Sequence, residues 1–310
     1  MSLSRNNTLH FFVELCRVIK KKEIMKILVT GATGKVGSRL VPRLLAKGLD
    51  IRILVRDESK VQHLKELGDE VITGDVNNPE TLPAALKGID TIIHVAGYFR
   101  NMQDTEGIMK TNYNGTMSLA DAAVGAGVKR FIFSSTSLVY GHDISHPADE
   151  NDPCNAETAP AYPASKLKAE KELLEMNAAG KLDVRIVRFG FVYGDGDDHL
   201  PDYPSLFPFF KAHPGARTHL LHHLDVAQAI FLLLNTEGIN GEIFNLGDDA
   251  AVTYYEIAKV LGQQDTAFNY SYHSPGNPFD SVMDTTKIRK VLGFRPLVPT
   301  LYQAIDMDIL

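Results

Sequence analysis

The feature that most constrains the fold is an apolar run, a glycine-rich turn and a helical pattern in direct succession. Residues 26–30 form a short apolar run typical of a buried strand, and apolar residues recur with helical spacing over 40–45. Between them lies a Gly-x-x-Gly-x-x-Gly turn. Glycine is needed where backbone turns tightly and approaches a pyrophosphate, and the next helix offers free N–H groups to phosphate. This order predicts a dinucleotide-binding unit, with cofactor contacts from Gly31, Thr33, Gly34, Lys35, Val36 and Gly37.

Four more apolar runs follow at intervals and predict a sheet of parallel strands. They cover residues 51–55, 70–73, 91–94 and 130–133, and segments with helical patterns separate them. Alternating strands and helices imply crossover connections, which make the strands parallel and put helices on both faces of the sheet. The predicted fold class is therefore α/β, a doubly wound parallel-sheet Rossmann fold.

The composition changes after Gly194, where prolines and phenylalanines interrupt any regular period. Long irregular segments of this kind are usually functional, so we predict a smaller C-terminal substrate lobe. We assign residues 25–194 mainly to the dinucleotide-binding domain and residues 195–310 mainly to the lobe. Segments around 220–247 are expected to return to the first domain.

Side chains at the ends of the predicted strands indicate which cofactor is bound. Arg56 lies where a dinucleotide with a free ribose hydroxyl usually meets an acidic residue. A guanidinium suits a 2′-phosphate, and Lys35 is expected to add a second cation near the same place. The prediction is NADP, with NAD as the alternative if Asp57 binds the ribose. Residues at other strand ends are also expected to contact the cofactor: Asp75, Val76, Ala96, Gly97 and Ser134.

Tyr162 and Lys166 form the candidate acid/base pair. They stand four residues apart on a predicted helix and therefore share one helical face. A nearby cation stabilises phenolate, so the tyrosine is expected to exchange a proton with a substrate oxygen nearer neutral pH than its usual pKa of about 10 allows. Hydroxyls over 134–137 precede this helix and could hold the same oxygen.

These motifs, in this order, resemble the extended short-chain dehydrogenase/reductase superfamily, including nucleotide-sugar epimerases and dehydratases and dihydroflavonol-reductase-like enzymes. The resemblance runs from about residue 26 to about residue 247. It rests on Gly-Ala-Thr-Gly-Lys-Val-Gly (31 to 37), Gly-Asp-Val (74 to 76), His-Val-Ala-Gly (94 to 97), Asn-Tyr-Asn-Gly-Thr (112 to 116), Ser-Ser-Thr-Ser-Leu-Val-Tyr-Gly (134 to 141), Tyr-Pro-Ala-Ser-Lys (162 to 166) and Arg-Phe-Gly-Phe-Val-Tyr-Gly (188 to 194).

The resemblance implies a role for each matching residue. Tyr162 would be the acid/base, Lys166 its activator and a ribose ligand, and Thr136 the hydroxyl that positions the reacting oxygen, with Ser135 as the fallback. Asn112 would support the active-site architecture. The family commonly has proline where this chain has Phe189, which is expected to contact the cofactor along an altered backbone path. The resemblance also implies a homodimer formed through a helix bundle that contains the Tyr162 helix.

Composition and charge limit the classes of binding partner that we expect for this protein. The formal net charge is −6, and the chain contains neither a long basic tract nor an apolar stretch of about 20 residues, so neither nucleic acid nor a membrane is an expected partner. Two distant cysteines, Cys16 and Cys154, indicate a reducing, cytoplasmic setting, and no spacing predicts a metal site. A small-molecule substrate is expected. Residues 1–24 precede Met25, which looks like a natural start, and are either a native extension or an artefact of the assigned start.

Three functions compete at this point. The first is an NADP-dependent reductase or dehydrogenase acting on a small or medium carbonyl or alcohol. The second is a nucleotide-sugar epimerase or dehydratase with tightly bound NAD. The third is a binding protein that keeps the fold without turnover, since fold does not establish activity. The acid/base set Tyr162, Lys166 and Thr136 favours an enzyme.

Overall fold

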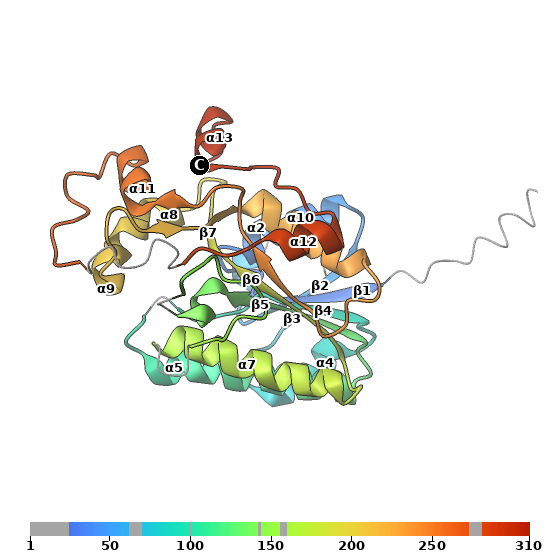
Figure 1. The fold of residues 1–310 in the computed structure, drawn as a ribbon. Coiled ribbons are helices and arrows are strands. Elements are labelled where there is room, and N and C mark those ends of the chain that lie inside the picture. Colours follow the sequence, from blue (N-terminus) through green and yellow to red (C-terminus); the bar gives the residue numbers. More distant parts are fainter. Residues whose placement is uncertain (1–24, 62–69, 100, 142–143, 156–159, 273–280) are drawn as a thin grey trace, which may run out of the picture.

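A seven-stranded parallel sheet forms the centre of the molecule (Figure 1). The computed structural model describes residues 25–61, 70–99, 101–141, 144–155, 160–272 and 281–310, so residues 1–24 and Cys16 lie outside the described part. Across the sheet the strands are β3 (Glu70–Thr73), β2 (Asp50–Val55), β1 (Lys26–Thr30), β4 (Thr91–His94), β5 (Arg130–Thr136), β6 (Asp183–Phe189) and β10 (Ile243–Leu246).

The strand order reverses between β1 and β4. Chain order runs outward from β1 through β2 to β3 on one side, and from β4 through β5 and β6 on the other. The chain segments that follow β1 and β4 turn away in opposite directions. A crevice therefore opens between them, beyond the carboxyl ends of the strands. The glycine turn follows β1 at this reversal, as the sequence predicts for a dinucleotide site.

Helices cover both faces of the sheet (Figure 1). One buried apolar cluster joins the sheet to helices α2 (Gly37–Ala46), α10 (His223–Asn235) and α12 (Thr286–Leu292). A second joins the opposite face to α4 (Leu82–Leu86), α6 (Gly115–Gly125) and α7 (Ala161–Ala178), and α5 (Thr105–Met109) contacts α7. The predicted doubly wound Rossmann class is confirmed.

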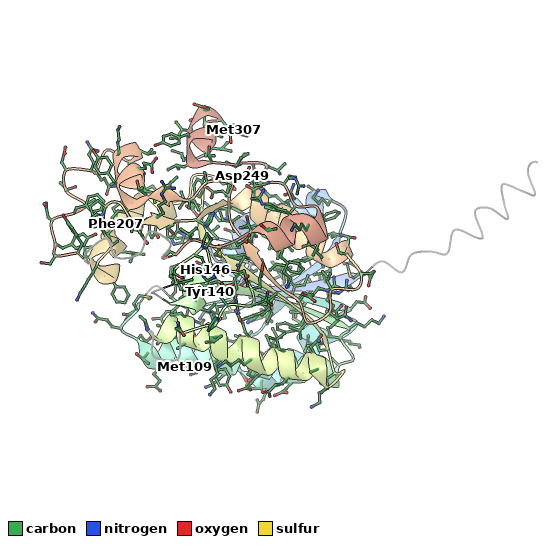
Figure 2. All side chains as sticks on the ribbon, viewed as in Figure 1. Met109, Tyr140, His146, Phe207, Asp249 and Met307 are labelled. Carbon is green, nitrogen blue, oxygen red and sulfur yellow. The ribbon has the colours of Figure 1, made fainter. Side chains whose placement is uncertain are left out.

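A third apolar cluster forms a lobe beyond the carboxyl ends of the strands. Phe207, labelled in Figure 2, is fully buried in it and packs against the rings of Tyr203 and Tyr254. The elements of this part are β7 (Phe191–Tyr193), α8 (His199–Asp202), η6 (Tyr203–Leu206), α9 (Phe207–Phe210), β8 (Arg217–Thr218), β9 (Leu220–His222), β11 (Val252–Thr253), α11 (Tyr254–Val260) and α13 (Leu301–Asp306).

Short helical turns complete the structure. Three 3-10 turns, η1 (Glu58–Val61), η2 (Pro79–Thr81) and η4 (Ser137–Tyr140), follow β2, β3 and β5. A π-helical turn, η3 (Lys110–Asn114), lies between α5 and α6. Within the described part of the chain, no helix is long and apolar enough to cross a membrane.

Two local expectations need correction. Strand β5 continues three residues past Phe133, because Ser134, Ser135 and Thr136 pair in register with β6. Asp225 resembles a helix-capping aspartate in sequence, but His222 caps α10, and its Nδ1 accepts a hydrogen bond from the Leu224 N–H at 3.2 Å. The Asp225 carboxylate instead accepts from two backbone N–H groups far along the chain, at residues 297 and 298.

Candidate active site

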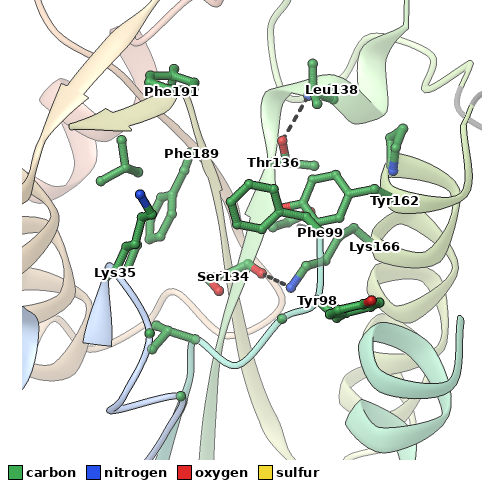
Figure 3. Close-up of a pocket in the computed structure, with 18 of the residues that line it drawn as sticks. Lys35, Tyr98, Phe99, Ser134, Thr136, Leu138, Tyr162, Lys166, Phe189 and Phe191 are labelled. Atoms are coloured by element: carbon green, nitrogen blue, oxygen red, sulfur yellow. Dashed lines mark hydrogen bonds between the residues drawn. The ribbon is translucent and has the colours of Figure 1, made fainter. Parts of the chain in front are cut away.

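A cavity of about 1090 Å³ occupies the crevice at the carboxyl ends of the strands. It runs from the end of β2, past the glycine turn, to the rings of the lobe. Ligand pockets usually measure about 300–1,000 Å³, so this cavity has room for an extended cofactor and a second molecule beside it. Figure 3 shows its central part.

The glycine turn leaves backbone exposed at the cavity wall. Gly31 has φ +83°, and a Cβ there would lie 2.6 Å from the Ala96 backbone nitrogen. A Cβ on Gly37 would overlap the Gly31 carbonyl oxygen. Helix α2 begins at Gly37, so the positive end of its dipole faces the same turn. These residues fit a pyrophosphate, and the predicted contacts at Thr33, Gly34, Lys35, Val36, Ala96 and Gly97 all line the cavity.

Two cations line the far end of the cavity beyond β2. Arg56 and Lys60 are both exposed there, near Asp75 and Val76. Lys60 was not predicted, although its position in the turn η1, four residues after Arg56, could have suggested it. The end of β2 therefore presents positive charge to the cavity.

Carboxylates at this end already have partners. Asp57 accepts hydrogen bonds from the Ser59 N–H at 3.0 Å and the Ser59 hydroxyl at 2.7 Å, and these bonds lower the pKa of Asp57. Asp75 accepts from the Asn77 N–H at 2.9 Å. Both bonds go to Oδ1, and Asp57 is not among the residues that line the cavity, which disfavours it as the ribose ligand.

Lys35 has a carboxylate partner in the structure. Its ammonium forms an ion pair with Asp198, in the loop that leads into the lobe, more than 160 residues further along the chain. Figure 3 shows the Lys35 side chain beside Phe189. That Lys35 adds a second cation beside Arg56 therefore stays a prediction.

Tyr162 and Thr136 are brought together by α7 and β5. The Thr136 side chain lies close enough to the Tyr162 hydroxyl to lower its pKa. Burial raises the pKa of Tyr162 to about 12, and the nearby Thr136 side chain opposes this only in part. The sequence leads us to expect a pKa lowered by the lysine. In the structure desolvation has the larger effect, so the phenol holds its proton at neutral pH.

Lys166 lies one helical turn further along α7. Its Nζ donates to the Ser134 carbonyl oxygen at 2.9 Å and lies 4.6 Å from the centroid of the Phe133 ring (Figure 3). Burial lowers the pKa of Lys166 to about 8, and the negative charge of Glu170 opposes this shift. The hydroxyl of Ser134 donates to the His94 carbonyl oxygen, which fixes the end of β5.

Asn112 forms hydrogen bonds that connect two segments of the site. It is buried in the π-helical turn, and its Oδ1 accepts from the Tyr98 N–H at 2.7 Å. Its Nδ2 donates to the Tyr98 carbonyl oxygen at 2.9 Å and to the Ser165 hydroxyl at 3.3 Å. Asn112 thereby joins the loop after β4 to the helix that carries Tyr162 and Lys166.

Aromatic rings form the opposite end of the cavity. The Phe99 ring lies 5.7 Å from the Tyr162 ring, and Phe191 stacks on Tyr203 at 3.6 Å. The sequence suggested an apolar pocket in the lobe but did not identify Phe99, which comes from the loop after β4. Further apolar lining comes from Met102, Leu138, Leu206, Phe209 and Tyr254.

Few charged side chains line the cavity. Among the described residues the cations are Lys35, Arg56, Lys60, Lys166 and Lys211, and the only carboxylate is Asp75. Arg217 is exposed and does not line the cavity. Over the described residues, no three His, Cys, Asp or Glu side chains gather in a way that could hold a metal ion.

Comparisons with known proteins agree with this architecture. The family model for the NAD dependent epimerase/dehydratase family matches residues 27–247. The chain is 31% identical over 244 residues to 4-hydroxy-2-methyl-3-oxo-4-farnesyl-3,4-dihydroquinoline-1-oxide ketoreductase of Stigmatella aurantiaca, covering 76% of this chain and 72% of that protein. It is 28% identical to UDP-glucose 4-epimerase of Lacticaseibacillus casei, covering 88% and 92%.

A solved structure of a related enzyme has the same fold. The dTDP-glucose 4,6-dehydratase DesIV of Streptomyces venezuelae, with NAD and TYD bound, superposes with a TM-score of 0.78 at 25% identity, covering 91% of this chain and 95% of that one. The sheet, the glycine turn and these comparisons lead to one conclusion. The protein is an enzyme of the NAD dependent epimerase/dehydratase family, within the extended short-chain dehydrogenase/reductase superfamily that its motifs resemble.

Proposed function

We propose that the protein is an NADP-dependent reductase or dehydrogenase acting on an apolar carbonyl or alcohol substrate. The observation that carries the proposal is the aromatic end of the cavity, where Phe99, Phe191 and Tyr203 lie beyond Tyr162. A sugar diphosphate carries two negative charges and many hydroxyl groups, which aromatic rings pair poorly, and Lys211 is the one cation of the lobe among the described lining residues. An apolar carbonyl compound fits this end of the cavity and reaches Tyr162.

The side chains around Tyr162 support proton transfer to a carbonyl oxygen. The bound nicotinamide supplies or accepts the hydride. Tyr162, kept protonated by burial, donates its proton to the oxygen that becomes the alcohol, while Thr136 orients that oxygen by a hydrogen bond. The Lys166 ammonium, which donates to the Ser134 carbonyl oxygen, would stabilise the phenolate that remains and hold the cofactor ribose.

The preference for NADP rests on Arg56 and Lys60. Both line the cavity at the end of β2, where the adenine ribose of a dinucleotide binds in this fold. A 2′-phosphate adds charge that these two side chains can pair, and Asp57, the acidic residue that could bind a free ribose hydroxyl, does not line the cavity.

A nucleotide-sugar epimerase or dehydratase is the second candidate. The superposition on DesIV and the similarity to UDP-glucose 4-epimerase favour it. A dehydratase must protonate a departing hydroxyl, and Asp75, the one carboxylate among the described lining residues, lies at the far end and is bonded to Asn77. This placement favours the reductase.

Turnover tests the proposal. We would follow NADPH oxidation with a panel of aryl and alicyclic ketones, and separately offer UDP-glucose and dTDP-glucose. Ketone reduction by the wild type and a loss of at least ~100-fold in kcat for Tyr162→Phe, with unchanged NADPH affinity, are expected. Tyr113→Phe is the matched control, because the Tyr113 hydroxyl binds Glu172 outside the cavity. Undiminished turnover in Tyr162→Phe, or turnover of the sugar nucleotides alone, would overturn the proposal.

A further inference from the structure

The lobe end of the cavity carries one cation that the proposed chemistry leaves unused. Lys211 follows α9, is exposed, and lines the cavity together with the rings of Tyr203 and Phe209. Its ammonium forms no ion pair or hydrogen bond with any residue that the structure describes. The one carboxylate among the described lining residues, Asp75, lies at the cofactor end. The positive charge of Lys211 is therefore open to a molecule that enters the cavity.

The backbone of Lys211 has a conformation that favours glycine. Its φ is +47° and its ψ is 40°, in the left-handed region. The Lys211 N–H donates to the Pro208 carbonyl oxygen at 3.2 Å, and the Ala212 N–H donates to the Phe207 carbonyl oxygen at 3.0 Å, so this residue closes the end of α9. A side chain is strained at such a helix end, where glycine is the usual residue. The lysine therefore needs an explanation from what its side chain does rather than from the turn.

His213 supplies a second hydrogen-bond donor at the same end of the cavity. Its Nδ1 accepts a hydrogen bond from the Gly215 N–H at 3.0 Å, so Nε2 carries the hydrogen of the neutral ring. The ring is half-buried, lies edge-on to the Tyr272 ring at 5.0 Å, and lines the cavity. An ammonium and an imidazole N–H thus come from residues two apart in the chain, Lys211 and His213, and both are cavity residues.

We propose that Lys211, with His213 beside it in the chain, binds a carboxylate that the substrate carries away from its reacting carbonyl. The inference rests on the proposed function and narrows its substrate class to apolar carbonyl compounds with one carboxylate. A carboxylate accepts several hydrogen bonds and is paired by an ammonium. One ammonium compensates one negative charge, whereas a sugar diphosphate carries two. The aromatic lining of the lobe suits the apolar body between the carbonyl and the carboxylate.

Three substitutions separate this role from stability and from general charge. Lys211→Gln removes the charge and keeps a long side chain. Lys211→Gly also relieves the left-handed backbone, so this variant should have a melting temperature at least equal to that of the wild type, and unfolding cannot explain its loss of selectivity. Lys259→Gln is the matched control, because Lys259 is an exposed lysine of α11 in the same lobe that does not line the cavity.

The experiment uses aryl ketones whose alkyl chain, of increasing length, ends in a carboxylate, each paired with its carboxamide. With NADPH, the wild type is expected to prefer the carboxylate of the best pair by about threefold or more in kcat/KM at low ionic strength. Added salt should reduce this preference, because it screens the charges. Lys211→Gln and Lys211→Gly should bring the ratio to near one, and Lys259→Gln should retain it. An unchanged ratio in Lys211→Gln overturns the inference.

The part of His213 is tested in the same assay. His213→Phe keeps an aromatic ring and removes the donor, so it should lose part of the preference for the carboxylate. A ratio equal to that of the wild type would overturn the role assigned to the histidine.

The failure of the inference is distinguishable from the failure of the proposed function. If the wild type reduces no ketone, the function fails, and the binding of each pair to the protein with NADPH is measured by calorimetry. Tighter binding of the carboxylate that is lost in Lys211→Gln would still support the inference, and equal binding of both members would overturn it. Binding of UDP-glucose that depends on Lys211, without binding of the keto acids, would also overturn it and assign the lysine to a diphosphate.

Discussion

Burial shifts the two candidate proton-transfer groups in opposite ways. Desolvation disfavours the charged form of each group, so the pKa of Tyr162 rises to about 12 while the pKa of Lys166 falls to about 8. The tyrosine therefore starts as an acid, which suits the reduction of a carbonyl. The lysine is a cation only below about pH 8, so its charge sets the upper limit of the pH range for activity.

We expect kcat for ketone reduction to fall as the pH rises through about 8. Above this pH Lys166 loses its proton, and no positive charge remains to stabilise the phenolate of Tyr162. Glu170 raises the pKa of Lys166, so Glu170→Gln should move the falling limb to lower pH. The check is the pH profile of kcat at saturating NADPH. A profile that is flat to pH 10 in the wild type would contradict this role of the lysine.

Single residues also mark the limit of prediction from sequence. The spacing of Tyr162 and Lys166 was sufficient to place both on one face of α7, because helical periodicity is local. The partner of Lys35 and the position of His199 depend on where the loop over 195–199 returns, which no local pattern specifies. Phe99 was missed for the same reason.

At the scale of elements, strand and turn chemistry was largely readable from the sequence. The runs at 26–30, 70–73 and 91–94 became β1, β3 and β4 at the predicted residues. Strands β1 and β4 are buried parallel strands, which are nearly continuous apolar runs, whereas β3 lies at the edge of the sheet. The hydroxyl-rich sequence at the end of β5 is typical of a loop. In the structure these residues pair with β6, so the strand extends to Thr136. A capping box formed by Thr253 and Glu256 begins α11, and its Thr-x-x-Glu spacing is visible in the sequence.

The turn between β1 and α2 allows a direct test of backbone shape. Gly31→Ala adds a Cβ at φ +83° against the Ala96 backbone, so the turn must shift away from the pyrophosphate. We expect NADPH affinity to fall by at least ~tenfold. Gly125→Ala is the control, because Gly125 lies in α6 with open space around its Cβ position. It should bind NADPH normally and gain up to about 1 kcal/mol in free energy of unfolding. Unchanged NADPH affinity in Gly31→Ala, measured by fluorescence titration, would contradict the assignment of this turn.

At the scale of the whole molecule, the cofactor helix and the lobe are joined across the cavity. Arg43 of α2 pairs with Asp195 at 2.8 Å, and Lys35 pairs with Asp198 in the same loop. The N–H of Asp195 also donates to the Ile309 carbonyl oxygen at 3.1 Å, so the C-terminal segment holds this loop. The two parts that are proposed to bind the cofactor and the substrate therefore contact each other directly.

The cofactor itself tests the central claim most directly. We would denature the purified protein, identify any released nucleotide by mass, and titrate the nucleotide-free protein with NADPH and NADH, using Arg56→Ser as the comparison. Arg56 and Lys60 predict that the cofactor exchanges freely, that NADPH binds at least ~tenfold more tightly than NADH, and that Arg56→Ser loses most of this preference. Stoichiometric NAD that stays bound until denaturation would contradict the reductase and support the epimerase or dehydratase.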